Sequence, residues 1–462
     1  MIAVYLVCSL AFFAIGWLSL RRDPLLAVGF FLGLQLFLWI TVYKTFPQLA
    51  FASGTFVNLA IALLFLRSCL AWPSVLLGRR SLVILGSIAL FLTYIAALAA
   101  LRGDSVQMYV LHFRNYFFNL LLLCVFLHVP ARRPRSANFY LRLVFLFVGI
   151  QVSLGLAQFL SRPVSDFFKV IEYSRLGVVQ VALPTVFRDQ KVVTGTLLAM
   201  QNVSSFVLMS IGFVVSSRLI ARLPQVRLGV TLTLCVFGVG MMIAAAVRSP
   251  IVGLVICAGL VLWFRSRSVA ILIAFSCVVL LPVAAATFSD DVQYATSVAA
   301  GRDVENPVQR LAGALSLADL SQLQYTTLRR TIELASEFRG QFVFGSGPGI
   351  IFTDYSITDA FLILLAIEFG LVGIVLLILP YVYTLRLLRH QTNVAVARVG
   401  WVVFLVTLSQ SVVNAGLWAD FANAHFMFLV MVLFRVGSGV TQRVESGAML
   451  DGVETHRAVA VA

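Results

Sequence analysis

Residues 344–362 read Phe-Gly-Ser-Gly-Pro-Gly-Ile-Ile-Phe-Thr-Asp-Tyr-Ser-Ile-Thr-Asp-Ala-Phe-Leu, and the rest of the chain is organised around them. They end the longest polar interval, Phe288 to Tyr355, and lead into a long apolar segment, Ser356 to Tyr383. The interval carries a large share of the acids and many of the arginines. Because apolar segments dominate on both sides, we predict a large loop that closes on the Gly-Ser-Gly-Pro-Gly run.

The composition is that of an integral membrane protein. Of the 462 residues, 61% are hydrophobic and 11% are charged, and apolar runs of about twenty residues recur along the chain. The net charge of +15 would suggest nucleic acid in a soluble protein, but here membrane topology explains it. We therefore expect the lipid bilayer as a partner and no nucleic acid. The six cysteines lie in apolar runs without CxxC spacing, so neither disulfides nor a zinc site is indicated.

The apolar runs predict an all-α polytopic membrane protein with about thirteen transmembrane helices, in the range 12–14. The predicted spans are Met1–Leu20, Pro24–Tyr43, Leu49–Leu66, Ser81–Leu101, Tyr109–Val129, Tyr140–Leu160, Thr196–Ile220, Leu228–Val247, Ile251–Phe264, Val269–Thr287, Ser356–Tyr383, Val399–Leu417 and Ala422–Phe434. Residues 437–462 are polar and lack apolar periodicity, so a disordered tail is expected there.

Arginines mark alternate connections between these spans. The odd-numbered connections, beginning with Arg21 and Arg22, are rich in arginine, and Asp23 is their only acid. The other acids before the tail, apart from Glu368, fall on the opposite side. The positive-inside rule then predicts an outer amino terminus, an inner carboxyl terminus, and outer loops at 161–194 and 288–355.

The large loop contains two candidate binding features. An amphipathic helix is expected at about Asp319 to Phe338. On it, Arg329-Arg330 either pair with nearby glutamates on a solvated face or hold a diphosphate through bidentate hydrogen bonds. The glycine run matches no P-loop, dinucleotide fingerprint or nucleophile elbow. It predicts a rigid turn, or a turn in which backbone amides at Gly345, Gly347 and Gly349 approach a phosphate or sugar.

Three further arginines lie near the predicted outer interface. Arg248, in Arg-Ser-Pro, interrupts two apolar segments that leave almost no room for a loop. Arg114 lies in Leu111-His-Phe-Arg-Asn-Tyr-Phe, and Arg188 precedes the helix that starts at Thr196. A guanidinium at this depth must snorkel, pair or face a polar cavity, so the three either anchor helices or converge on one anionic ligand.

Carboxylates and histidines supply the remaining candidates. Asp359 begins a helix and Asp354 lies just before it, so they act as caps or supply a general base that deprotonates an attacking hydroxyl. Glu368 is deep in a span and must be paired or protonated. His112 and His425 are the histidines predicted at the outer side, and packing or capping is expected of both.

In several ordered patterns the chain resembles the O-antigen ligase/polymerase superfamily, most clearly from about residue 188 to 385. The stretches of this chain that resemble motifs of the family are Leu111-His-Phe-Arg-Asn-Tyr-Phe-Phe, Leu156-Ala-Gln-Phe-Leu, Val193-Thr-Gly-Thr-Leu, Ala246-Val-Arg-Ser-Pro-Ile, Phe344-Gly-Ser-Gly-Pro-Gly, Thr358-Asp-Ala-Phe-Leu and Glu368-Phe-Gly-Leu-Val-Gly. The resemblance divides the chain into amino-terminal helices (1–187), a family-like core with its periplasmic loop (188–385), carboxyl-terminal helices (386–436) and the tail (437–462).

The resemblance implies a bacterial inner-membrane glycosyltransferase that joins undecaprenyl-diphosphate-linked repeat units at the periplasmic face, without a metal or other cofactor. It assigns the diphosphates to Arg114, Arg188, Arg248, Arg329 and Arg330. Asp359, with Asp354, is then the expected catalytic base. The ligases of this superfamily carry a histidine in the helix after the loop, whereas Ser356–Leu362 has none. The sequence therefore favours a polymerase, for O-antigen or exopolysaccharide.

Three alternatives stay open. A ligase would transfer finished glycan to lipid A core or to protein. A transporter of lipid-linked glycans would need a charged path across the membrane, whereas here the charges gather at the outer rim and Glu368 is the main deep exception. A non-catalytic assembly scaffold is the third. The resemblance also names a polysaccharide chain-length regulator as a candidate partner.

Overall fold

The structure is a computed structural model, and it describes residues 2–19, 23–45, 50–71, 79–103, 117–125, 137–168, 172–173, 179–180, 193, 195–197, 200–223, 226–245, 248–267, 339–347, 361–410 and 422–437. Three of the predicted features, the span Val269–Thr287, the loop helix Asp319–Phe338 and the tail beyond Gly437, lie outside these residues.

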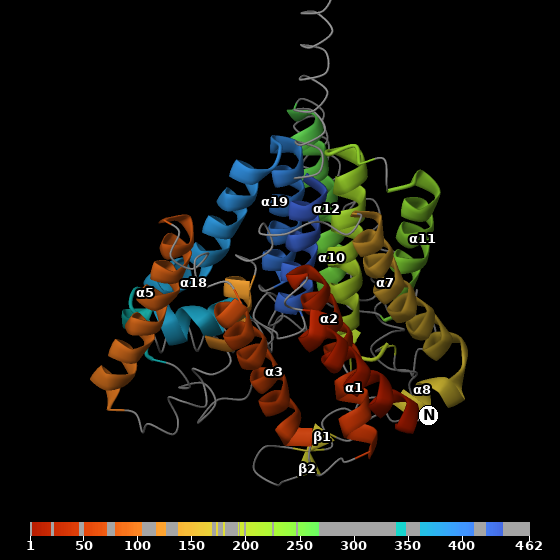
Figure 1. The fold of residues 1–462 in the computed structure, drawn as a ribbon, viewed down its shortest axis with the longest axis horizontal. Coiled ribbons are helices and arrows are strands. Elements are labelled where there is room, and N and C mark those ends of the chain that lie inside the picture. The colour runs from red at the N-terminus through yellow and green to blue at the C-terminus, as the bar shows by residue number, and fades with distance from the viewer. Residues whose placement is uncertain are drawn as a thin grey trace, which may run out of the picture.

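The described part of the chain is almost entirely helical (Figure 1). Its helices are α1 (Ile2–Ser19), α2 (Pro24–Thr45), α3 (Ala50–Ala71), α5 (Arg79–Arg102), α7 (Ala137–Leu160), α8 (Arg162–Phe168), α10 (Met200–Leu219), α11 (Leu228–Ala244), α12 (Arg248–Arg265), the 3-10 turn η3 (Arg339–Gln341), α18 (Phe361–Gln391) and α19 (Val394–Gln410). Residues 117–125 and 422–437 are also helical. Two short strands, β1 (Glu172–Tyr173) and β2 (Val179–Gln180), pair antiparallel.

Four of the described helices are long and apolar enough to cross a membrane, namely Ser81–Arg102, Asn138–Leu160, Asn202–Leu219 and Leu365–Gln391. Shorter apolar helices accompany them, among them Pro24–Leu38, Leu228–Ala244 and Ala422–Gly437. The chain is therefore a helical membrane protein, as predicted. The number of crossings and the side on which each end lies stay predictions.

Several predicted boundaries differ from the structure. The span predicted to end at Tyr383 continues as α18 to Gln391, and α19 begins at Val394 rather than Val399. Asn393 makes this tight connection possible, because its side-chain oxygen accepts the backbone N–H of Val396 (2.8 Å) and caps α19. The interval 161–194, predicted to be a polar loop, contains α8 and the β1–β2 hairpin.

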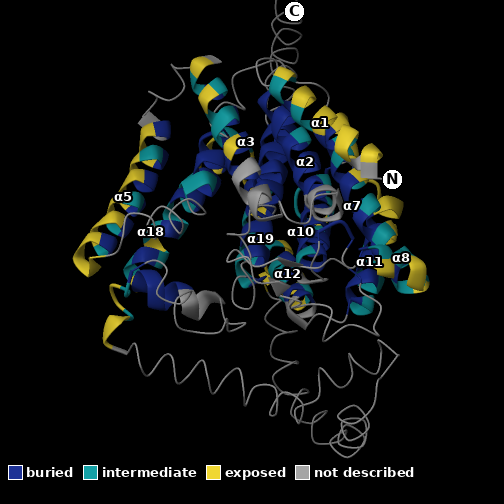
Figure 2. Ribbon diagram, turned by 90° about the horizontal axis from the view of Figure 1, so that it is seen from below, coloured by how far each residue is buried: buried dark blue, intermediate teal, exposed yellow. Residues whose placement is uncertain are grey.

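The interior of the bundle is formed by α2, α10, α19 and the 422–437 helix, in which every residue is buried. Figure 2 shows the exposed residues on the outward sides of α1, α3 and α5. Many of these are large and apolar, such as Leu70 (76% exposed), Leu90 and Val7. A soluble protein rarely exposes such a surface, whereas a membrane protein presents it to lipid.

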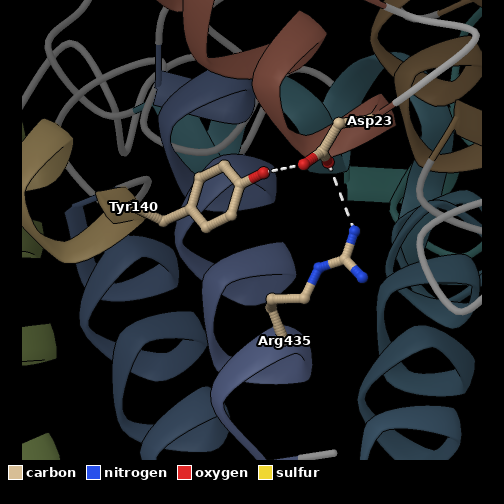
Figure 3. A network of polar contacts seen from close by, with 3 residues as sticks. All are labelled: Asp23, Tyr140 and Arg435. Carbon is tan, nitrogen blue, oxygen red and sulfur yellow. Dashed lines mark hydrogen bonds and ion pairs between the residues drawn. The ribbon is translucent and has the colours of Figure 1, made fainter. Parts of the chain in front are cut away.

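Helix ends that belong to the predicted inner face lie together in the structure. In Figure 3, Asp23 before α2 accepts hydrogen bonds from Tyr140 of α7 and from Arg435 of the 422–437 helix. The Arg435–Asp23 distance is 3.2 Å, and both side chains are at most 6% exposed. At the same end, Arg67 of α3 lies 4.8 Å from the Trp17 ring of α1. These contacts are consistent with the prediction, made from the alternating arginines, that these helix ends face the same side of the membrane.

Candidate functional site

Helix α18 is broken where the large loop returns to it. Gly370 has a φ of 65° and a ψ of 178°, which no α-helix contains. Residues 342–347 of the loop fill this break. Four backbone hydrogen bonds join the two segments, with donors named first: Ser346 to Ile367 (2.7 Å), Gly347 to Glu368 (2.9 Å), Leu371 to Phe342 (2.8 Å) and Val372 to Val343 (3.1 Å).

This arrangement satisfies both helix ends that the break creates. The loop amides donate to the last carbonyls of the first half of α18, and the loop carbonyls accept from the first amides of the second half. In a membrane no water replaces such bonds, so a broken helix is tolerated only where other protein groups complete it. We call this contact between 342–347 and 367–372 the loop splice.

Two glycines make the loop splice possible. Gly345 has a φ of 79°, and a Cβ atom there would lie 2.5 Å from the carbonyl oxygen of Glu368. A Cβ on Gly370 would lie 2.4 Å from the carbonyl oxygen of Val343. Both positions therefore exclude other residues by conformation and by space. The N–H of Gly345 donates to Gln341 (2.5 Å), so neither it nor that of Gly347 is open to a phosphate here.

A tyrosine from α5 holds the loop splice against the bundle. The Tyr94 hydroxyl donates to the carbonyl of Phe344 and lies 3.0 Å from that of Phe369. One turn earlier, the Phe91 ring contacts the Phe369 ring edge-on, with 5.8 Å between centroids. Glu368, next to the break, is 5% exposed, so it is as deeply buried as its position predicted.

A second pair of distant segments meets through two glutamines of α7. The Gln158 side chain makes two hydrogen bonds of 2.9 Å to Gly195, one to its N–H and one to its carbonyl. Seven residues earlier on the same helix face, Gln151 bonds the hydroxyl (2.7 Å) and the N–H (3.0 Å) of Thr196. Gly195 has a φ of 55°, and a Cβ there would lie 2.2 Å from the Gln151 side-chain oxygen. This glutamine clamp fixes the chain just before α10.

Helix α12 begins in the same region. Met241, near the end of α11, packs on Gly155 of α7, which also lies close to Val193. After the short connection that follows, α12 begins at Arg248 rather than at the predicted Ile251. The Arg-Ser-Pro motif thus forms the first turn of a helix, where proline is well tolerated because an N–H there has no partner in any case. The structure describes the Arg248 backbone but not its side chain.

Most other sequence-predicted site residues lie outside the described part of the chain. These are Arg114, Arg188, Arg329, Arg330, Gly349, Asp354 and Asp359. Their expected convergence on a diphosphate, and the expected base role of Asp359, stay predictions. Of the predicted residues, the described part brings Gly345 and Gly347 next to Glu368 and places Arg248 at a helix start.

Sequence reasoning missed the partners that these segments use. Tyr94 gave no signal, because nothing around it in the sequence distinguishes it from other aromatic residues of an apolar helix. Gln151 and Gln158 did carry one, since two amides seven residues apart on a membrane helix must find hydrogen-bonding partners.

No protein-family model, curated protein or solved structure matches this chain.

Proposed function

We propose that this protein is a glycosyl-transfer polymerase of the membrane, which joins oligosaccharide repeat units carried on undecaprenyl diphosphate. A hydroxyl oxygen of the incoming unit attacks the anomeric carbon of the growing chain. The bond from that carbon to the diphosphate breaks, and the carrier diphosphate leaves with the electron pair. The hydroxyl proton passes to a base, for which Asp359 is the candidate.

One observation carries the proposal. The motifs on which the family resemblance rests are far apart in the sequence, yet four of them meet as two hydrogen-bonded pairs. Leu156-Ala-Gln-Phe-Leu meets Val193-Thr-Gly-Thr-Leu in the glutamine clamp. Phe344-Gly-Ser-Gly-Pro-Gly meets Glu368-Phe-Gly-Leu-Val-Gly in the loop splice. These contacts support the proposal, because motifs that share a site are expected to lie together.

The electrostatics of the reaction favour arginine at such a site. The leaving group is a diphosphate, so negative charge grows on it as the glycosidic bond breaks. Fixed guanidinium groups in a partly dehydrated pocket stabilise that charge, and their planar fork matches phosphate oxygens. Arg248, whose backbone lies at the start of α12, is the candidate of this kind that we propose to test.

The test is complementation of a deletion strain, with glycans profiled both on the carrier lipid and at the cell surface. Wild type should restore long polymer, and Arg248→Ala should lower its yield by about two orders of magnitude, as for loss of one group that stabilises the transition state. The matched control is Arg265→Ala, because Arg265 is exposed at the opposite end of the same helix.

The other functions give different outcomes in the same experiment. Long polymer that accumulates on the carrier without reaching its acceptor would identify a ligase. Loss of carrier-linked units from the outer face would identify a transporter. If Arg248→Ala and Asp359→Ala both restore full polymer while the protein accumulates normally, the protein is a scaffold and the polymerase proposal is wrong.

A further inference from the structure

A histidine in the bundle interior has a nitrogen that the described structure leaves unused. His425 belongs to the Ala422–Gly437 helix and is 0% exposed. Its ring stacks on Phe206 of α10, with 3.9 Å between ring centroids. Nε2 lies 2.8 Å from the Ser210 hydroxyl, whereas Nδ1 is buried and has no hydrogen-bonding partner among the described residues.

The hydrogen bonds of Ser210 favour one of the two neutral tautomers of His425. The Ser210 hydroxyl donates to the carbonyl of Phe206 at 2.9 Å, and a hydroxyl has only one proton to give. With that proton on the Phe206 carbonyl, Nε2 of His425 donates to Ser210, and Nδ1 is then a bare acceptor. A buried acceptor without a partner destabilises the fold, so its retention needs an explanation.

Within a few residues of His425 and of Ser210 along their helices, the described side-chain hydrogen bonds join uncharged groups. Two residues before it, Asn423 donates to the Asn119 carbonyl (2.9 Å) and accepts from the Tyr381 hydroxyl (3.2 Å). Nearer the start of α10, Ser205 contacts Gln410 of α19 at 3.4 Å. Amides and hydroxyls of this kind suit a neutral hydrogen-bonding ligand better than a diphosphate, which is bound by cations.

The depth of His425 relative to α12 follows from helix packing. Gly253 of α12 lies against Leu208, and Cys257 lies 3.5 Å from a Cβ built on Gly212. The two helices therefore run in the same direction, and Ser210 is level with a residue seven positions after Arg248. At 1.5 Å per residue, His425 is about 10 Å deeper in the bundle than the start of α12.

We propose that Nδ1 of His425 accepts a hydrogen bond from a hydroxyl of the bound glycan, in a neutral subsite about 10 Å deeper than the start of α12. The subsite rests on the proposed function, because the hydroxyl belongs to the carrier-linked substrate. His425 is a positioning residue there, since it binds a sugar away from the reacting bond. Its acceptor is selective for a donor such as O–H and rejects an anion.

Two isosteric variants separate this role from a purely structural one. An asparagine side chain places its amide where Nδ1 stands, and a glutamine side chain places its amide where Nε2 stands. His425→Asn therefore keeps the free acceptor and loses the Ser210 bond, while His425→Gln does the reverse. In purified protein, we expect His425→Gln to raise the KM for a carrier-linked repeat unit about tenfold, because it loses one hydrogen bond to the substrate. We expect His425→Asn to raise the same KM less than about threefold.

The opposite order, or equal KM values, would show that Ser210 bonding or an interior water accounts for the histidine, and would overturn the subsite. A second measurement is independent of activity. Nitrogen-15 NMR of histidine-labelled protein should show the His425 proton on Nε2, and a proton on Nδ1 overturns the subsite even if both variants fail to fold. If wild type makes no polymer at all, the proposed function is wrong, and the NMR result alone then decides whether Nδ1 is a free acceptor.

Discussion

The two ends of the helix bundle are held together by different kinds of contact. At one end, Asp23, Tyr140 and Arg435 join three helices through charged and polar side chains (Figure 3). At the other, the loop splice joins a loop to a broken helix through backbone groups, and glycines make the approach possible. The first contact therefore depends on which side chains are present, and the second on the absence of a side chain.

This difference determines how each end should respond to substitution. A side-chain contact is lost when its groups are removed, and the backbone stays where it was. A backbone contact is lost when a side-chain atom is added to one of its glycines, because the extra atom separates the two segments over all four hydrogen bonds. The following three substitutions test that distinction, from the largest expected effect to the smallest.

Substitution at the break in α18 should have the largest effect. In Gly370→Ala the new Cβ would lie 2.4 Å from the Val343 carbonyl oxygen, at a φ that alanine rarely adopts. We expect a loss of more than about 4 kcal/mol in the free energy of unfolding, seen as failure to accumulate in the membrane. The matched control is Gly259→Ala, where a Cβ meets no atom within 4 Å. A Gly370→Ala protein as stable as that control would show that the loop splice does not hold the fold.

Removal of one charge at the opposite end should have an intermediate effect. Asp23→Asn leaves Arg435 buried beside a neutral group, and we expect a loss of about 3 kcal/mol in detergent unfolding experiments. Adding Arg435→Gln should restore part of that loss, because no uncompensated charge then remains buried.

The control for this pair is exposed. Arg162 and Asp166 of α8 lie 3.9 Å apart with side chains 62% and 48% exposed. Neutralising Asp166 should change stability by less than about 0.5 kcal/mol. Equal effects of Asp23→Asn and Asp166→Asn would mean that water reaches the Asp23 pair.

Tyr94→Phe should have the smallest effect. It removes the hydroxyl that contacts the loop splice and keeps the ring that packs there. We expect a loss of about 1 kcal/mol, measured as a lower midpoint in thermal unfolding of purified protein. Tyr383→Phe, in the second half of α18, serves as the control. A larger loss than in Asp23→Asn would show that the tyrosine, rather than the backbone, holds the loop in place.

The sequence predicted the helices well because long apolar runs are a local signal. It missed the end of α18, since Arg386 and Arg389 looked like a connection, although long cationic side chains at a membrane interface are compatible with a continuing helix. The predicted turn at Gly345 and Gly347 was right in kind, but its partner, Gly370, lies in another segment, and no local pattern pairs them. Likewise the depth of Glu368 was predictable, whereas the role of Tyr94 depended on tertiary packing.

The ion pair of Asp23 also imposes an order on biosynthesis. Its two residues are 412 positions apart, so Asp23 emerges from the ribosome and reaches the membrane long before Arg435 has been made. Tyr140 arrives sooner, 117 positions later, and can give the carboxylate a hydrogen bond but no opposite charge. The first helices must therefore wait with an acid near the bilayer until the last helix inserts. A chain that stops short of this helix would keep that acid without its guanidinium partner.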